Sequence, residues 1–453
     1  MQTLVRWSAL FALTIFPSFA RAQSGPPHAV TLTEVLQRAR ENPPAILAAL
    51  ATLQRTQAQE QYARGTYIPR FTVEAGSGIG YADQPYLTKE NRASLQKFSQ
   101  EPVPPTAQST TQQTFGRANL DIPVLDLGRH YAVKAAHMNS DAQRSAYSAA
   151  QRSATNAGAE LYMRSLAALA LVEDARLTLE RRTSQHDAIS GLVRAGLRPS
   201  VDATRAQIEV IAAGFALQTR EIEVSATGAS LAAAMGNDPT QPVVAATFDD
   251  GVLPAPLPPL EASVRAVELR PEIKQLESNV ASKRADHQAA IGARLPTVGL
   301  QAIGNVARVS LYHGDGVEGR TLAGSGSVYM RWAALDPTIW RRANVTRGAI
   351  EEAQRQLEAT LLAVRVEVVD AAYQVQRTRA MLDQATQVLA AAEAARTAQN
   401  ERYRAGVASL LDLLDAESIE QSARRQRIEA ERDQRIARVR LLAACGTIGE
   451  LTK

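Results

Sequence analysis

AGLRPSVD at residues 195–202 and AGVASLLD at residues 405–412 are the two stretches that decide the fold. In each, a glycine, which adopts a positive φ without strain, separates two long helical patterns. The offset between the two glycines is 210 residues, and it also relates three other pairs: Asp126 and Asp336, Leu231 and Leu441, and Gly236 and Gly446. A period this long indicates a duplicated half of a domain rather than a solenoid repeat.

The offset changes upstream of residue 126. There it is 227 residues, and it relates Glu34 to Glu261, Pro44 to Pro271 and Pro69 to Pro296. The extra 17 residues must lie between Pro69 and Asp126. We therefore expect the first of two hairpin loops to be longer than the second by that amount.

The N-terminus predicts a secretory signal over residues 1–22. Arg6 precedes an apolar stretch from Trp7 to Phe16, and Ala20-Arg21-Ala22 fits the small-x-small cleavage pattern. No run of about 18 apolar residues follows, so the sequence predicts an exported chain without a transmembrane helix.

The composition excludes several other classes. Cys445 is the only cysteine, so there is no intrachain disulfide, and its repeat counterpart Met235 predicts an apolar packing position. The net charge of +4 is too small to indicate a nucleic acid partner. The six histidines lack metal-ligand spacing, and no catalytic constellation is evident. We therefore expect no enzyme activity, no cofactor and no metal site.

Hydrophobic periodicity predicts the elements of each repeat. The first repeat, 23–235, is expected to hold a helix over 33–64, a strand hairpin over 67–125 with a polar loop at 83–113, and helices over 128–194 and 200–235. Six prolines make residues 236–260 a linker. The second repeat, 261–446, is expected to hold a helix over 261–292, a hairpin over 295–336 with a loop at 311–323, helices over 338–404 and 408–445, and a tail at 447–453.

The long helix of the second repeat has the clearest pattern. Positions spaced by four and three residues run through five heptads, which predicts a coiled-coil seam: Leu357, Leu361, Val364, Val368, Ala371, Val375, Thr378, Leu382, Ala385, Leu389 and Ala392. The matching seam of the first repeat is interrupted by Gln151, Ser165 and Arg182. Asp126 to Gly196 would span roughly 105 Å as a helix, which favours a tall wall over a globule.

The strand segments are rich in aromatic residues. Outside the predicted signal, 10 of 18 aromatics fall within 67–125 and 295–340: Tyr67, Phe71, Tyr81, Tyr86, Phe98, Phe115, Tyr312, Tyr329, Trp332 and Trp340. Such segments suit a lipid-facing barrel with interfacial girdles, and an ordinary soluble sheet fits the periodicity equally well. Four strands cannot close a barrel, so strands in a membrane would require an oligomer: two chains supply eight strands and three supply twelve.

The repeated order of hairpin, long helix, glycine turn and helix resembles the TolC-like outer-membrane efflux proteins over nearly all of the predicted mature chain. YRAGVASLLDLLDA at 403–416 is similar to the second periplasmic tip of that family, and Gly196 to Asp202 is similar to its first tip. ANLDIPVLDLGR at 118–129 is similar to its strand-to-helix junction.

The resemblance implies a mainly α fold with a β-barrel part, built by a homotrimer. Its twelve-stranded barrel would cross the outer membrane of a Gram-negative bacterium, and a helical barrel would project through the periplasm to a periplasmic adaptor (a membrane fusion protein) and an inner-membrane transporter. Small-molecule efflux is the leading function that it implies. Type I protein secretion is the alternative within the class. A periplasmic coiled-coil adaptor or a purely structural coiled coil are the alternatives outside it.

The resemblance also implies roles for residues at the tip. Asp412 and Asp415 match positions that point into the periplasmic entrance, where six carboxylates of a trimer would form a cation-attracting ring with some raised pKa values. The alternative is a solvated helix face, or pairing with Arg404. Asp202 and Tyr403 match positions that hold the tip closed through a hydrogen bond. A family arginine is Ala408 here, so Arg404 or Arg198 could replace it.

Six residues at the two turns are candidates for contact with the adaptor, by the same resemblance: Gly196, Leu197, Ser200, Gly406, Val407 and Ser409. The alternative is that they only form the turns, and both can hold together.

Overall fold

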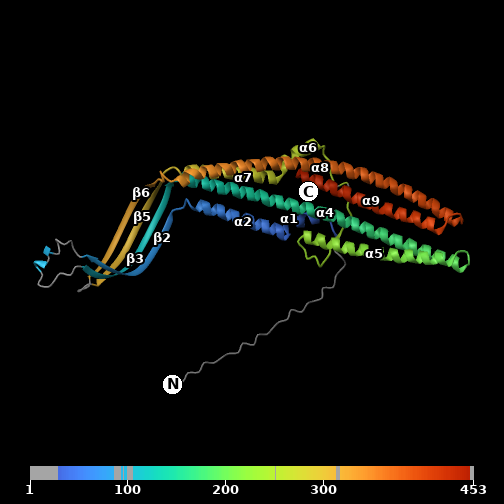
Figure 1. The fold of residues 1–453 in the computed structure, drawn as a ribbon, viewed down its shortest axis with the longest axis horizontal. Coiled ribbons are helices and arrows are strands. Elements are labelled where there is room, and N and C mark those ends of the chain that lie inside the picture. Colours follow the sequence, from blue (N-terminus) through green and yellow to red (C-terminus); the bar gives the residue numbers. More distant parts are fainter. Residues whose placement is uncertain are drawn as a thin grey trace, which may run out of the picture.

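The structure is a computed structural model that describes residues 29–85, 93–94, 96–98, 106–249, 251, 253–312 and 317–448. The predicted signal at 1–22 and residues 449–453 of the predicted tail lie outside the described residues. The molecule is elongated, with strands at one end, two helical turns at the other, and long helices between (Figure 1).

Helices make up most of the described chain. They are α1 (Leu32–Glu41), α2 (Pro44–Gly65), α4 (Leu127–Arg194), α5 (Ser200–Ala234), α6 (Pro259–Leu269), α7 (Pro271–Gly292), α8 (Pro337–Arg404) and α9 (Leu410–Cys445). The repeat is visible in their lengths, since α4 and α8 have 68 residues each and α2 and α7 have 22 each. None of the described helices is long and apolar enough to cross a membrane.

The single helices expected over 33–64 and 261–292 are each divided in two. The breaks fall before Pro44 and before Pro271, at the same repeat position. Pro43 and Arg270, the residues in front of them, have ψ angles of 143° and 123° and are not helical. Proline disfavours the helical conformation in the residue before it and lacks the N–H that would continue the helix. The prediction of one continuous helix was therefore wrong in both repeats, because each segment forms two helices.

Equivalent residues begin and end the helices of the two repeats. The side chains of Asp126 and Asp336 accept hydrogen bonds from the first backbone N–H groups of α4 and α8. Among the described residues, positive φ occurs only at four glycines that follow helix ends: Gly196, Gly236, Gly406 and Gly446. Both tip glycines thus adopt the conformation expected from the sequence.

The four long strands form one antiparallel sheet in the order β2 (Arg70–Pro85), β3 (Thr106–Leu125), β5 (Thr297–Tyr312) and β6 (Val317–Arg331). The central pair β3–β5 joins the two repeats, so β2 and β6 each pair on one side only within the chain. Segments assigned to loops from the sequence belong to strands: 83–85 and 106–113 in the first hairpin, and 311–312 and 317–323 in the second. Hairpin pairing satisfies the backbone of these segments, of which 106–113 is polar and Thr-rich, and the hydrophobic pattern alone did not reveal it.

The linker between the repeats also contributes structure. Its short strand β4 (Val244–Ala245) pairs in parallel with β1 (Ala29–Val30), and its last residues begin α6. This contact fastens the beginning of the described chain to its middle, in a core cluster to which α1, α4, α5, α9 and the linker contribute.

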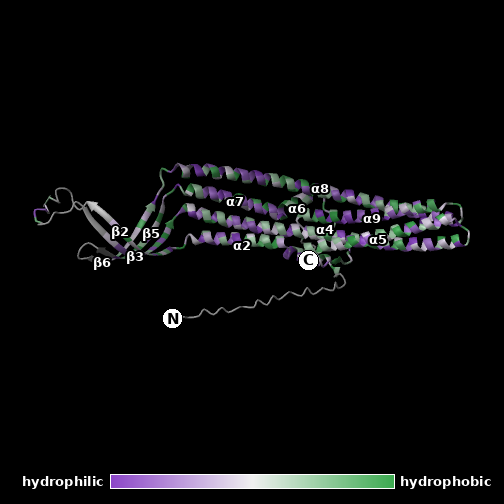
Figure 2. Ribbon diagram, turned by 60° about the horizontal axis from the view of Figure 1, so that its bottom comes forward, coloured by the Kyte–Doolittle hydropathy of each residue, from purple (hydrophilic) through white to green (hydrophobic). Residues whose placement is uncertain are grey.

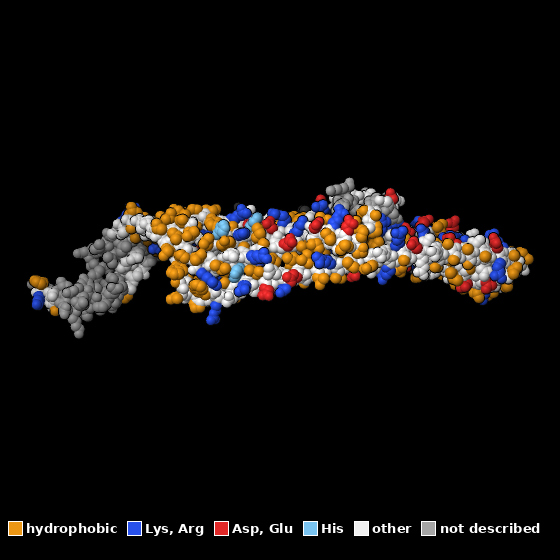
Figure 3. Space-filling view, turned by 90° about the horizontal axis from the view of Figure 1, so that it is seen from above, with side chains coloured by type: hydrophobic (Ala, Val, Ile, Leu, Met, Phe, Trp, Pro, Cys, Tyr) orange, Lys and Arg blue, Asp and Glu red, His pale blue; other side chains and the backbone are white. Residues whose placement is uncertain are grey.

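The long helices lie side by side in a row, along the long axis of the molecule (Figures 1 and 2). Next to the strands α4 packs against α2 and α7, and α7 against α8; toward the tip α5 packs against α4, α4 against α9, and α9 against α8. Hydrophobic side chains lie among charged ones on the helical surface in view in Figure 3.

The predicted seam of α8 faces this packing. Val364, Val368, Val375, Thr378 and Ala392 are buried, and the remaining seam positions are partly buried. Val364 and Val368 share a core cluster with Cys445, which is 2% exposed. The apolar packing role predicted for this cysteine is confirmed.

Candidate functional site

The two helical turns at the end opposite the strands form the candidate site, called the tip below. Residues 195–199 connect α4 to α5 and residues 405–409 connect α8 to α9. Side chains from all four helices share one cluster under the turns: Ile189, Ala206, Tyr403, Ala408, Leu410 and Leu413. Leu197 and Val407, at the apex of each turn, are 70% and 71% exposed. The tip is therefore one packed unit with two exposed apolar residues.

Arg198 joins the two turns. Its guanidinium carbon lies 4.5 Å from the centroid of the Tyr403 ring, and its Nη2 donates to the Tyr403 carbonyl oxygen at 3.4 Å. A cation over an aromatic face is attracted by the ring quadrupole. Of the two arginines considered as substitutes at the tip, the structure brings Arg198 to Tyr403 and leaves Arg404 exposed.

Asp202 and Tyr403 are both 9% exposed. The buried Tyr403 hydroxyl has no hydrogen-bond partner among the described residues, so the bond expected between this pair is not formed within a single chain. Burial raises the pKa of Tyr403 and the nearby Asp202 carboxylate raises it further, while Arg198 lowers it. The pair is thus coupled electrostatically, with a phenol still free to donate.

Asp412 has a local role that the sequence interpretation missed. The Asp412 carboxylate accepts from the Ser409 backbone N–H at 3.0 Å and from its hydroxyl at 2.8 Å, and the Asp412 N–H donates to Ser409 Oγ at 3.2 Å. This is a capping box for α9, and the signal for it was Ser409-Leu-Leu-Asp412 ahead of a helical pattern. The Ser409 hydrogen bonds lower the pKa of Asp412, so within one chain its shift is opposite to the raised values expected for the ring.

Asp415 lies one helical turn further along α9, and both carboxylates are exposed in the single chain. The other candidates lie at the two turns. Gly196 and Gly406 have φ values of 73° and 77°, Ser200 begins α5, and Ser409 is the N-cap of α9. The residues predicted to contact an adaptor thus form the turns or begin the helices beside them, and their contact with an adaptor stays a prediction.

A cluster of charges lies behind the tip around the buried side chains of Arg182 and Glu420, and we call it the ion cage: Arg181, Arg182, Arg396, Glu417, Glu420 and Arg424. Glu420 is 2% exposed, and its carboxylate contacts Arg396 at 2.9 Å, Arg181 at 3.5 Å, and Arg424. Arg182 pairs with Glu417. Burial raises the pKa of Glu417, against the opposing effect of Arg182.

The ion cage links α4 of the first hairpin of helices to α8 and α9 of the second. Sequence reasoning did not find it, although Arg182 was one of the residues that interrupted the first seam. The presence of Arg182 on an otherwise apolar helix face was the signal in the sequence, because a buried charge requires a partner of opposite sign.

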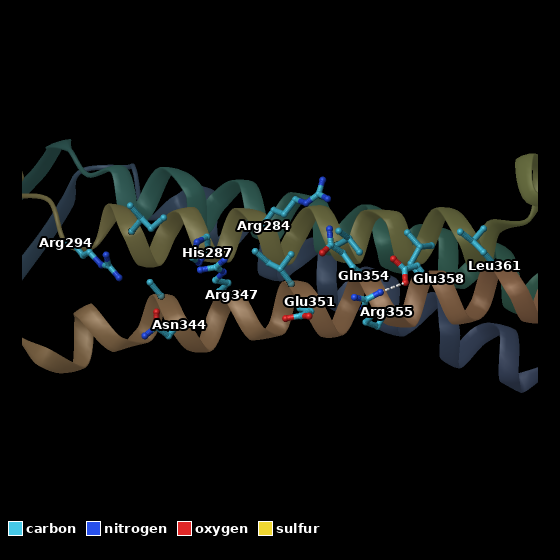
Figure 4. Close-up of a pocket in the computed structure, with 15 residues that line it drawn as sticks. Arg284, His287, Arg294, Asn344, Arg347, Glu351, Gln354, Arg355, Glu358 and Leu361 are labelled. Atoms are coloured by element: carbon cyan, nitrogen blue, oxygen red, sulfur yellow. Dashed lines mark hydrogen bonds and ion pairs between the residues drawn. The ribbon is translucent and has the colours of Figure 1, made fainter.

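A groove of about 820 Å³ lies between α7 and α8, away from the tip (Figure 4). Side chains of both signs line it, including Arg284, Arg347 and an ion pair between Arg355 and Glu358 at 2.9 Å. Within the described ranges, no group of three or more His, Cys, Asp or Glu residues could hold a metal ion.

Known proteins share sequence or fold with this chain. Protein CyaE of Bordetella pertussis is 29% identical over 270 residues, which cover 57% of this chain and 55% of that protein, so the match spans about half the length of the relative. The outer-membrane channel OprN superposes with a TM-score of 0.74 at 20% identity and 92% coverage of this chain and 89% of that one. The open state of the Neisseria gonorrhoeae MtrE outer membrane channel gives a TM-score of 0.69 at 18% identity, covering 93% and 90%.

These superpositions show the shared fold, mainly helical with a strand part and a duplicated half. The model of one family, described as outer membrane efflux protein, matches residues 35–237 and 262–447, which are the two repeats. The chain therefore belongs to the outer membrane efflux protein family, a family of channels and not of enzymes.

Proposed function

We propose that three copies of this chain form the outer-membrane channel of a tripartite efflux system. One observation carries the proposal: an open sheet with two half-paired edge strands continues into a row of long helices that ends in a packed tip. An open edge in lipid leaves backbone groups unsatisfied at several kcal/mol each, so β2 of one copy must pair with β6 of another. Three copies would contribute twelve strands.

The channel would sit in the outer membrane of a Gram-negative bacterium, with lipid around the strands. The helices, roughly 100 Å long in α4 and α8, would extend into the periplasm. Membership of the family supports this placement, because its members are described as outer membrane efflux proteins.

The tip would act as an iris-like gate at the periplasmic entrance. Asp412 and Asp415 of three copies would supply six carboxylates around it, which favour cations and repel anions. Arg198 on Tyr403 would hold the closed form within each chain, and the free Tyr403 hydroxyl would be available to an Asp202 carboxylate when copies assemble.

The partners would be a periplasmic adaptor and an inner-membrane transporter. Leu197 and Val407 support an adaptor site, since both are exposed apolar residues at the apex of the tip. With them we assign Gly196, Ser200, Gly406 and Ser409 to the contact. Small molecules are the proposed cargo, and type I protein secretion is the alternative. A periplasmic adaptor would be expected to contain one helical hairpin, whereas this chain has two.

Single-channel conductance in planar bilayers tests the proposal. The purified protein should give a trimer by light scattering and a small, cation-selective conductance. A monomer without conductance from a folded sample would refute the channel. Substrate class is tested by expressing the chain with its own adaptor and transporter in a strain that lacks its endogenous channel. Lowered drug accumulation supports efflux, and a secreted protein supports type I secretion.

A further inference from the structure

One face of the four-stranded sheet carries a largely apolar groove of about 360 Å³. The strand register sets Ile122 of β3 beside Leu300 of β5, and Leu300 beside Val328 of β6, so these side chains share one face. The opposite face holds Asp121 and Tyr329, whose hydroxyl donates to the Asp121 carboxylate at 3.0 Å. The face with the groove is therefore the one suited to lipid.

This apolar face ends at two tryptophans and an arginine. Val328, Met330 and Trp332 follow one another at every second residue, and all three are exposed. The Trp332 indole N–H donates to the Arg294 carbonyl oxygen at 3.0 Å, and the Arg294 guanidinium carbon lies 4.8 Å from the centroid of the Trp340 ring. Tryptophan favours the level of the lipid headgroups, where its ring is in the apolar layer and its N–H is not. The end of the sheet beside α7 and α8 thus has the composition of a membrane interface.

Most of the hydrogen-bonding capacity of Arg294 is unused. A guanidinium has five N–H donors. Among the described residues, the Arg294 side chain makes one hydrogen bond, from Nη2 to the Trp340 carbonyl oxygen at 2.8 Å, and its buried Nε has no partner. No carboxylate of the described residues pairs with this guanidinium. An anion from outside the chain would supply the opposite charge and further acceptors.

The groove between α7 and α8 begins at Arg294 and continues past Asn344 and Arg347. Figure 4 shows the side chains of Arg294 and Arg347 extending into the gap between the two helices. Arg347 forms no hydrogen bond or ion pair with any described residue. Along the α8 wall the first carboxylate is that of Glu351, one helical turn further from the strands. The end of the groove that adjoins the strands is therefore positively charged.

We propose that this end of the groove binds the headgroup phosphate of an anionic phospholipid, in the membrane leaflet that adjoins the helices. Arg294 and Arg347 would donate to the phosphate oxygens, which guanidinium groups bind in a fork geometry. The Asn344 amide would add a donor between them. The occupant is thus a lipid with a negatively charged headgroup. The proposal rests on the proposed function, because it requires the strands to lie in a bilayer.

The apolar face of the sheet would hold the acyl chains of the same lipid. Val328, in the groove on the sheet, is four residues from Trp332, which is about 13 Å of strand. Trp332 contacts the residue that begins the basic groove. A phospholipid whose phosphate lies at Arg294 therefore reaches the sheet groove with its chains, and the tryptophans lie beside its glycerol.

Tryptophan fluorescence reports on this site directly. Trp332 and Trp340 are the only tryptophans outside the predicted signal, because the third is Trp7. Phospholipids with brominated acyl chains quench tryptophan on contact. The purified protein is reconstituted in vesicles of brominated phosphatidylcholine, and unbrominated phosphatidylglycerol is added in increasing proportion. The recovery of fluorescence gives the affinity of phosphatidylglycerol relative to phosphatidylcholine at these two residues.

The unchanged protein should prefer phosphatidylglycerol by about fivefold or more, which is the contribution of one basic side chain near an anionic lipid. Arg347→Gln should lower the preference, and Arg294→Gln with Arg347→Gln should bring it close to one. Arg342→Gln is the matched control. Arg342 is exposed and lies five residues before Arg347 on α8, but it does not line the groove. The preference of this control should equal that of the unchanged protein.

Three results would overturn the lipid site. The first is equal affinity for the two lipids in the unchanged protein. The second is an equal loss of preference in Arg347→Gln and Arg342→Gln, which would assign the preference to the general surface charge. The third is a preference abolished by inorganic phosphate but kept in potassium chloride of the same ionic strength, which would make free phosphate the ligand.

Quenching and conductance of the same vesicles separate this proposal from the proposed function. Quenching by brominated lipid without a headgroup preference refutes the lipid site and keeps the strands in the bilayer. A folded protein that no brominated lipid quenches refutes the membrane placement, and the site with it. A headgroup preference that depends on Arg347, in vesicles without conductance, supports the lipid site and refutes the channel.

Discussion

The guanidinium of Arg198 lies 4.5 Å from the centroid of the Tyr403 ring, and this contact ties the first helical turn to the second. At the 210-residue offset, the counterpart of Arg198 is Ala408. The position two residues after each tip glycine thus holds an arginine in one repeat and an alanine in the other. Ala408 is 7% exposed within the tip cluster, where an arginine would bury its charge, whereas Arg198 reaches the Tyr403 ring from the outside.

Replacing Arg198 with alanine should loosen the tip. Loss of a cation–π contact of about 1 kcal/mol changes a two-state population about fivefold. We expect the basal conductance of the assembled channel to rise by up to about that factor. Arg194→Ala is the matched control, because the Arg194 side chain donates a hydrogen bond to the Ser190 carbonyl oxygen of its own helix, at 3.4 Å, and does not join the two turns among the described residues. Equal conductance in both variants would show that Arg198 does not hold the gate.

The charge of the entrance is tested apart from the helix cap. Asp412→Asn with Asp415→Asn removes the carboxylates while an amide oxygen still accepts the Ser409 hydrogen bonds. Cation selectivity, measured as a reversal potential in a salt gradient, should fall toward neutrality. Ser409→Ala removes the cap partner of Asp412 and keeps both carboxylates. The cation selectivity of this variant should therefore equal that of the unchanged protein. Unchanged selectivity in the double variant would refute the ring.

The first turn of α9 should loosen in acid. The folded-state pKa of Asp412 is lowered by Ser409, so this carboxylate contributes stability above its ordinary pKa of 3.8 and loses it as the pH falls through the lowered value. Amide hydrogen exchange at Leu413 and Leu414, corrected for intrinsic rates, should accelerate below that range. In Asp412→Asn the corrected exchange should lose this pH dependence, because the carboxylate that accepts the Ser409 hydrogen bonds is absent.

Removing the central carboxylate of the ion cage should destabilise the fold. Glu420→Gln leaves three arginines around a neutral group, and breaking a buried pair costs about 3–5 kcal/mol. Glu358→Gln is the control. Its pair with Arg355 is exposed, with side-chain exposures of 64% and 72%, and such pairs contribute about 0–1 kcal/mol. Chemical denaturation followed by circular dichroism measures both, and equal losses would contradict a structural role for the cage.

Glycines at the ends of helices should differ in their tolerance of alanine. Gly196 has a φ of 73°, and apart from its own chain neighbours no atom of the described residues lies within 4 Å of the place that a Cβ would take, so Gly196→Ala bears only the left-handed strain of about 1–2 kcal/mol. At Gly236 a Cβ would also lie 2.8 Å from the backbone carbon of Asn42, so Gly236→Ala should lower the denaturation midpoint further. If the denaturation midpoint fell further in Gly196→Ala than in Gly236→Ala, the backbone around Asn42 would have moved to make room for the Cβ.

The fold was readable from the sequence because its information is local and repeated. Glycine turns, capping aspartates and heptad spacing act within a few residues, so the ends of α4 and α8 lie within one residue of where the pattern predicts them. Strand ends were less accurate. The segment from Thr106 to Gln113 is polar, and its pairing with β2 depends on a partner more than 20 residues away, which no local pattern encodes.

By itself, the sequence determined the duplication, the two tips and the long helices, because period and turn chemistry are properties of consecutive residues. Only the tertiary structure decided which side chains meet across helices: that Arg198 reaches Tyr403, and that Glu420 is enclosed by three arginines. Those contacts join residues far apart in the chain or choose among several partners of the same charge. The choice depends on helix order and relative height, which are fixed only when the hairpins pack.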